Sequence, residues 1–100
     1  IERDPSNPQN WASKAFISAG GISRDLGVTC PNQYEMETKK AIIESSISTL
    51  LTADSSKIGK VHSTYFADLK NFDAFITDGG ITDEYEALTE QLGVALYKAD

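Results

Sequence analysis

The stretch Thr49-Leu50-Leu51-Thr52-Ala53-Asp54-Ser55-Ser56-Lys57-Ile58-Gly59-Lys60 joins a short apolar run to a polar loop. In α/β proteins a buried strand delivers its carboxyl end to a ligand crevice, and the following loop carries the ligand-binding groups. The acid, hydroxyls and lysine of this loop suit an anion or a sugar phosphate. A solvated turn after a buried strand uses the same residue types. The stretch therefore indicates an α/β fold and leaves two interpretations of its loop open.

Strand-like and helix-like segments alternate on both sides of this stretch. Strands are expected over 14–19, 49–53, 74–78 and 94–97, with an edge strand over 61–66 and a helical turn over 68–72. Asn32 is a good helix N-cap, with Glu35 three residues later, and Thr82 and Gly93 bound a second helix. Strands separated by helices of about 10 to 15 residues favour a parallel sheet. The predicted fold class is α/β, a mostly parallel, Rossmann-like sheet with flanking helices.

The two predicted helices each carry an apolar stripe at helical spacing. The members of the two stripes are Met36, Lys40, Ile43 and Ile47 in the first, and Tyr85, Leu88 and Leu92 in the second. On a neighbouring face of the first helix, Glu35 stands one turn before Lys39, the order that an exposed ion pair prefers.

A nine-residue pattern occurs twice in the chain. Ala15-Phe16-Ile17-Ser18-Ala19-Gly20-Gly21-Ile22-Ser23 returns as Ala74-Phe75-Ile76-Thr77-Asp78-Gly79-Gly80-Ile81-Thr82. If both begin in parallel strands, their Gly-Gly loops open at the same sheet edge as the 54–60 loop. Glycine suits a sharp change from strand to loop, so the repeat indicates one structural solution used twice.

Composition and charge exclude several classes of protein. The 100 residues are 40% hydrophobic and carry a formal net charge of −6, which indicates a small acidic globular domain or part of a larger one. Without clustered lysine and arginine, direct binding of nucleic acid by this chain is not expected. The single Cys30 excludes an internal disulfide and fits a reducing cytoplasm, and no metal-ligand spacing or membrane-length apolar run is present.

Five separated strings, taken in order, resemble the effector-binding domain of DeoR-type bacterial transcriptional regulators. They are Ala15-Phe16-Ile17-Ser18-Ala19-Gly20-Gly21-Ile22, Gly27-Val28-Thr29-Cys30-Pro31-Asn32-Gln33-Tyr34-Glu35, Lys39-Lys40-Ala41-Ile42-Ile43, Ala53-Asp54-Ser55-Ser56-Lys57-Ile58-Gly59, and Phe75-Ile76-Thr77-Asp78 with Gly80-Ile81. The resemblance implies a ribose-5-phosphate isomerase-like sensor fold that binds a phosphorylated sugar. It further implies control of a carbohydrate operon, with operator DNA bound only through a separate helix-turn-helix domain.

The resemblance covers only part of such a regulator. Residues 1–13 contain no match to the first half of the sensor domain or to the DNA-binding domain, and the chain begins at Ile1 rather than methionine. We therefore expect a linker or loop leader over 1–13 and the C-terminal portion of a sensor domain over 14–100. Exposed sheet edges would favour self-association, as a dimer or tetramer in the full-length protein.

The resemblance also implies roles for individual residues. Lys57 would bind a phosphate or sugar oxygen, and Asp54 would accept sugar hydroxyls or orient Lys57. Gly20 and Gly21 would allow the backbone to approach the ligand closely. The remaining members of the predicted effector-binding set lie at the start of the first helix and are Asn32, Glu35 and Lys39. These three have a purely structural interpretation as well, a helix cap and a solvated charge pair.

An enzyme is the competing interpretation, because the same segments resemble part of ribose-5-phosphate isomerase, which has a comparable Ala-Asp-Ala-Ser-Lys loop. Proton transfer in that enzyme needs carboxylates in its first loop, where this chain has the acid-free stretch Ile17-Ser18-Ala19-Gly20-Gly21. We therefore predict no catalytic residues, no cofactor and no enzymatic activity. A ligand-insensitive oligomerisation domain is the third alternative.

Overall fold

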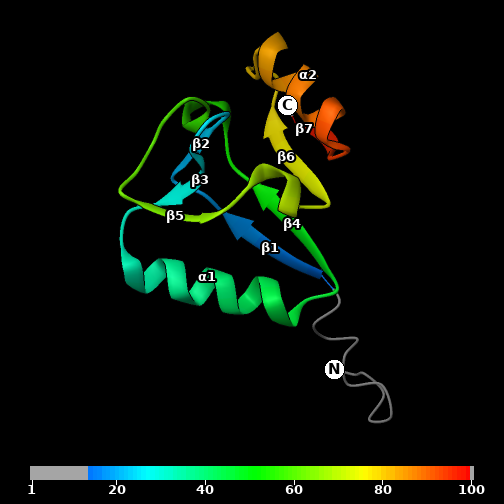
Figure 1. Ribbon diagram of the computed structural model, residues 1–100. Helices are drawn as coiled ribbons and strands as arrows, with labels where there is room; N and C mark the ends of the chain where they lie inside the picture. The colour runs from blue at the N-terminus through cyan, green and yellow to red at the C-terminus, as the bar shows by residue number, and fades with distance from the viewer. Residues whose placement is uncertain (1–13, 100) are drawn as a thin grey trace, which may run out of the picture.

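A four-stranded parallel sheet forms the centre of the protein (Figure 1). The computed structural model describes residues 14–99. The strands lie side by side in the order β1 (Lys14–Ser18), β4 (Ser48–Thr52), β6 (Ala74–Asp78) and β7 (Ala95–Ala99). All neighbouring pairs are parallel, so the carboxyl ends of the strands meet at one edge. The predicted parallel sheet is confirmed, with small shifts at strand ends, whereas the predicted leader over 1–13 lies outside the described residues.

A second, antiparallel sheet packs beside the first and was not predicted from the sequence. It contains three strands in the order β2 (Gly21–Ser23), β3 (Gly27–Cys30) and β5 (Thr64–Ala67). The strand expected over 61–66 is β5, shifted toward the C-terminus. A strand as short as β2 has no readable alternation, and the tight turn before β3 depends on Gly27, which has φ +80°.

Two α-helices flank the sheets, α1 (Gln33–Ser45) and α2 (Asp83–Leu92). Both begin where the sequence predicts. The Asn32 side chain accepts the Glu35 backbone N–H at 2.9 Å, and Thr82 accepts the Tyr85 N–H at 3.4 Å. Gly93 ends α2 in the left-handed conformation with φ 75°. Short 3-10 helices over Ser55–Lys57 and Leu69–Asn71 complete the described elements, and the second is the helical turn expected over 68–72.

The predicted apolar stripe of α1 is only partly correct, because none of the residues of this helix is fully buried. Met36 and Ile43 are half-buried against the core, but Lys40 is exposed and Ile47 lies beyond the end of the helix, 69% exposed. Figure 1 shows α1 beside β5 and β1, at the border of the sheets rather than over their centre. In α2, Leu88 is buried as predicted and Tyr85 is half-buried against the core, but Leu92, at the last turn of the helix, is 37% exposed.

The core lies on one face of the parallel sheet. Ile17, Leu51 and Phe75 are neighbours across β1, β4 and β6, and each is almost completely buried. On the opposite face, Phe16 and Tyr97 are 65% and 59% exposed. Parallel sheets in proteins are normally covered on both faces. The described residues therefore leave one apolar face of the sheet open.

Candidate functional site

The loop after β4 begins with a compact turn around a carboxylate. Asp54 precedes the 3-10 helix Ser55–Lys57, and its side chain accepts the Ser56 backbone N–H at 3.0 Å and the Ser56 hydroxyl. These hydrogen bonds, that of the hydroxyl above all, lower the pKa of the Asp54 carboxyl below its ordinary value. The turn closes with the Lys57 N–H donating to the Asp54 carbonyl at 3.1 Å. Lys57 thus sits, half-buried, on a turn of defined shape at the carboxyl edge of the sheet.

A second carboxylate joins this turn to the loop after β6. Asp78 accepts the Ser55 backbone N–H at 3.0 Å through one oxygen and the Gly80 N–H at 2.8 Å through the other. These two bonds are the main reason that the pKa of the Asp78 carboxyl is lowered. Asp78 is absent from the predicted site residues. Its position as the last residue of the predicted strand over 74–78, directly before Gly79-Gly80, was the signal that could have identified it.

The far end of the loop is fixed to β2. The Gly59 N–H donates to the Ile22 carbonyl at 2.7 Å, and the following residues, Lys60 to His62, lie against the glycines of the first repeat. A Cβ on Gly21 would lie 2.3 Å from the Lys60 carbonyl oxygen, and one on Gly20 would lie 2.8 Å from the His62 ring. The close approach at Gly20 and Gly21 is therefore by the chain itself, which explains these glycines without a ligand. Their predicted contact with an effector stays a prediction.

The predicted site residues Asn32, the N-cap of α1, and Glu35 and Lys39 within α1 form a separate group. Lys39 and Glu35, both within the described part of the chain, do not form an ion pair, so the predicted pair is wrong. The Lys39 ammonium instead donates to the Ser18 carbonyl at 2.7 Å and the Ser18 hydroxyl at 3.2 Å, where the carboxyl end of β1 offers unpaired acceptors. The Asn32 side chain is used as the helix cap.

Two small cavities border these two groups. One of about 270 Å³ lies between the ends of β4 and β6 and is lined by Ala53, Asp54, Ile76, Thr77, Asp78 and Ala99. The other, of about 230 Å³, lies between β1 and α1, with Glu35 and Lys39 in its wall. The structure therefore places Asp54 and Asp78 at one cavity, with Lys57 on the adjoining 54–57 turn, and it places Glu35 and Lys39 at the other cavity.

Comparison with protein families decides which class of protein carries this arrangement. Residues 9–79 match the family model described as the DeoR C terminal sensor domain. The chain belongs to the DeoR sensor-domain family. The order of strings in the sequence had predicted this family, and the prediction is confirmed.

Relatives of this DeoR sensor domain are transcriptional regulators. It is 32% identical over 81 residues to the HTH-type transcriptional regulator GlpR of Haloferax volcanii, covering 81% of this chain and 32% of GlpR. It is 38% identical over 71 residues to the deoxyribose operon repressor of Escherichia coli K12, covering 71% of this chain and 28% of the repressor. The HTH-type transcriptional regulator IolR of Bacillus subtilis is 31% identical over 87 residues, or 87% of this chain and 35% of IolR. The chain thus spans about a third of the length of these curated relatives.

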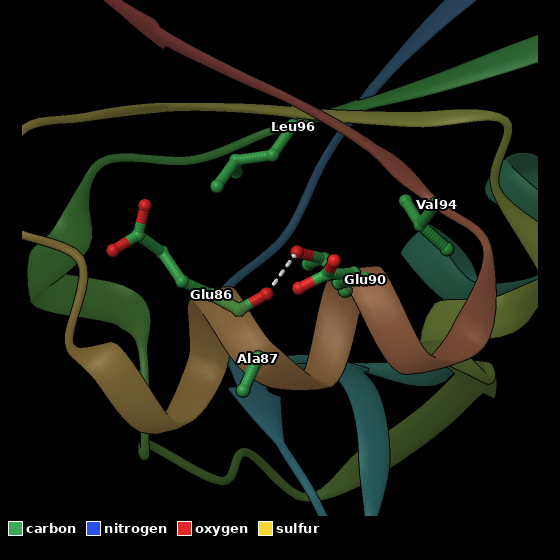
Figure 2. A pocket seen from close by; sticks show the side chains of 6 residues that line it. Glu86, Ala87, Glu90, Val94 and Leu96 are labelled. Carbon is green, nitrogen blue, oxygen red and sulfur yellow. Dashed lines mark hydrogen bonds between the residues drawn. The ribbon is translucent and has the colours of Figure 1, made fainter.

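A larger cavity of the DeoR sensor domain, about 530 Å³, lies between α2 and the segment formed by Val94 and the start of β7 (Figure 2). Figure 2 shows Glu86 and Glu90 on one wall and the apolar side chains of Val94 and Leu96 opposite. Glu86 also forms an ion pair with Lys98. None of the predicted site residues lines this cavity, and its two carboxylates would repel a phosphate group.

Within residues 14–99, no three histidine, cysteine, aspartate or glutamate side chains gather in a way that would hold a metal ion. None of the helices described over the same range is long and apolar enough to cross a membrane.

The lowered pKa values of Asp54 and Asp78 predict an acid-sensitive loop. Both folded-state values lie below the ordinary 3.8, so their stabilisation is fully present above that pH and is lost as the pH falls through the folded values. In urea denaturation at decreasing pH, the free energy of unfolding should fall more steeply below about pH 4 for the unaltered DeoR sensor domain than for Asp78→Asn. Equal pH dependence of the two proteins would contradict this expectation.

Proposed function

We propose that this DeoR sensor domain binds a phosphorylated sugar and that, in the full-length protein, binding changes the affinity of a separate helix-turn-helix domain for operator DNA. The observation that carries the proposal is the turn with Asp54 and Lys57 at the carboxyl edge of a parallel sheet, where α/β proteins bind ligands. The membership of the DeoR sensor-domain family and the names of its relatives, HTH-type regulators and an operon repressor, support the regulatory part.

The chemistry of the turn suits a sugar phosphate. The Lys57 ammonium is a flexible cation that can bind phosphate oxygens as a point charge. The Asp54 carboxylate, exposed and ionised, accepts hydrogen bonds of the kind that sugar hydroxyls donate. The family resemblance assigns Gly20, Gly21 and Asn32 to the same site, together with Glu35 and Lys39, which line a separate cavity.

The same resemblance assigns residues 14–100 to the C-terminal portion of a larger, ribose-5-phosphate isomerase-like sensor domain. The open apolar face with Phe16 and Tyr97 supports this assignment, because further polypeptide is needed to cover it. The cover consists of the rest of the sensor domain or a second subunit, and self-association as a dimer or tetramer follows from the second arrangement. A cytoplasmic location accords with binding to operator DNA.

We infer that the domain senses its ligand without converting it. Isomerisation of a sugar phosphate requires a base beside the carbon that loses its proton. The segment from Ser18 to Gly21 contains no carboxylate, and the Lys39 ammonium is held at the Ser18 carbonyl. Asp78, the carboxylate at the end of β6, already accepts the Ser55 and Gly80 N–H groups through its two oxygens.

The proposal is tested with the full-length protein, its operator fragment and a panel of sugar phosphates. At least one member of the panel is expected to change operator affinity, measured by fluorescence anisotropy, because an effector must bind one conformational state more tightly than the other. Conversion of a sugar phosphate to its isomer would instead establish the enzyme. A stable oligomer whose operator affinity responds to no member of the panel would support the ligand-insensitive alternative and defeat the proposal.

A further inference from the structure

We propose that Asp78 is a positioning residue of the effector site, whose carboxylate fixes the turn that carries Lys57. This inference rests on the proposed function, because it assigns a role in the same site. Asp78 lies in one of the strings that carry the family resemblance, but it was not among the predicted site residues.

The first support is the pair of bonds that the carboxylate makes. One oxygen accepts the Ser55 N–H from the loop after β4 at 3.0 Å, and the other accepts the Gly80 N–H from the loop after β6 at 2.8 Å. Each N–H belongs to a residue outside the regular ladders of the sheet. Hydrogen bonds to a charged acceptor are stronger than neutral ones, so a single side chain holds the two loops at a fixed separation.

The connection from this anchor to Lys57 is short. Ser55 begins the 3-10 helix that ends at Lys57, and the Ile58 N–H closes it by donating to the Ser55 carbonyl at 3.1 Å. Ser55 therefore links Asp78 to the turn: its N–H is bound by the Asp78 carboxylate, and its carbonyl accepts the hydrogen bond that closes the turn after Lys57. Release of that amide would let the turn open and move the Lys57 ammonium.

A second, independent observation is the packing of Ser55 against the β6 loop. A Cβ on Gly80 would lie 2.4 Å from the Ser55 hydroxyl oxygen and 3.1 Å from its Cβ. The serine side chain thus occupies the place that any larger residue at position 80 would take. The two loops are fitted to each other at this point, as well as hydrogen-bonded.

The same pair of strands offers a control at its opposite end. Asp73 precedes β6, and its carboxylate accepts the Thr49 N–H of β4 at 2.8 Å. It makes a comparable link between β4 and β6 at the amino-terminal edge of the sheet, remote from Lys57. A merely structural role would affect Asp73 and Asp78 variants alike.

The test compares Asp78→Ala with Asp73→Ala in the full-length protein by calorimetric titration with the sugar phosphate that binds the unaltered protein. Asp78→Ala is expected to weaken binding about tenfold, whereas Asp73→Ala should change it by less than about twofold. Backbone amide hydrogen exchange provides a readout that needs no ligand, and exchange over residues 54–57 should accelerate in Asp78→Ala only. If Asp78→Ala does not fold, Asp78→Asn, which keeps one acceptor oxygen, replaces it.

The possible outcomes separate the two proposals. Equal loss of affinity in both variants, or unchanged exchange over residues 54–57 in the Asp78 variant, would overturn the positioning role. Absence of binding by the unaltered protein would contradict the proposed function and with it the effector role of Asp78. If the unaltered protein does not bind but amide exchange over residues 54–57 is still faster in Asp78→Ala, the role of Asp78 is only to hold the two loops together.

Discussion

Lys57→Ala is expected to weaken binding of the phosphorylated sugar by about ten- to a hundredfold, the range associated with losing a hydrogen bond between charged groups. The ammonium is the cation of the described 54–57 turn, and no other residue of that turn can replace its charge. The domain should remain folded, because Lys57 is only half-buried and its backbone bonds survive the substitution. Isothermal titration calorimetry gives the affinity, and thermal denaturation shows whether the fold is intact.

Lys60→Ala is the matched control for this experiment. Lys60 lies in the same loop and carries the same charge, but its side chain is exposed beyond the 3-10 turn. Removal of either lysine lowers the general positive potential of the loop equally, so a specific contact should appear only in the Lys57 variant. Equal, small effects of the two substitutions would remove Lys57 from the binding site.

Gly21→Ala is expected to destabilise the sensor domain by about 3 kcal/mol, the upper part of the range for overpacking a buried position. The added methyl group would lie 2.3 Å from the Lys60 carbonyl oxygen, a backbone atom that cannot rotate away. The backbone around Lys60 is held on both sides. The Gly59 N–H donates to the Ile22 carbonyl at 2.7 Å, and the His62 N–H donates to the Thr29 hydroxyl at 2.9 Å. Chemical denaturation of the full-length protein measures this loss of stability from the unfolding transition of the sensor domain.

Gly79→Ala is the control for the glycine experiment. It belongs to the second copy of the repeat, but a Cβ there meets no atom within 4 Å and its φ does not require glycine. We expect a change of about 0.5 kcal/mol or less, since an unstrained alanine also restricts the unfolded chain. Similar losses at positions 21 and 79 would show that the contact with Lys60 is not the cause.

Local signals predicted the central sheet and the helix ends well. The strand over 74–78 is apolar and stopped by Gly79-Gly80, and the structure has β6 at these residues. The cap residues Asn32 and Thr82 also act as predicted, because a side chain that bonds an N–H three residues later needs no tertiary contact. Each of these features is decided within a few neighbouring residues.

Features that depend on distant segments were not predictable in this way. The small antiparallel sheet pairs β3 with β5 across more than thirty residues, as its Thr29–Tyr65 pairing illustrates, and β2 is only three residues long. The Lys39 ammonium donates to the Ser18 carbonyl rather than pairing with Glu35, because the carboxyl end of β1 lies beside α1. The role of Asp78 likewise depends on which loop lies beside it.

The most direct test of the sensing site is a calorimetric titration of the full-length protein with matched pairs of ligands, each a phosphorylated sugar and the same sugar without phosphate. The proposed function predicts saturable binding of at least one phosphorylated member, with affinity reduced in Lys57→Ala, and no measurable binding of its unphosphorylated partner. Equal binding of both members of a pair, or phosphate-dependent binding that Lys57→Ala leaves unchanged, would contradict a phosphate site on the 54–57 turn.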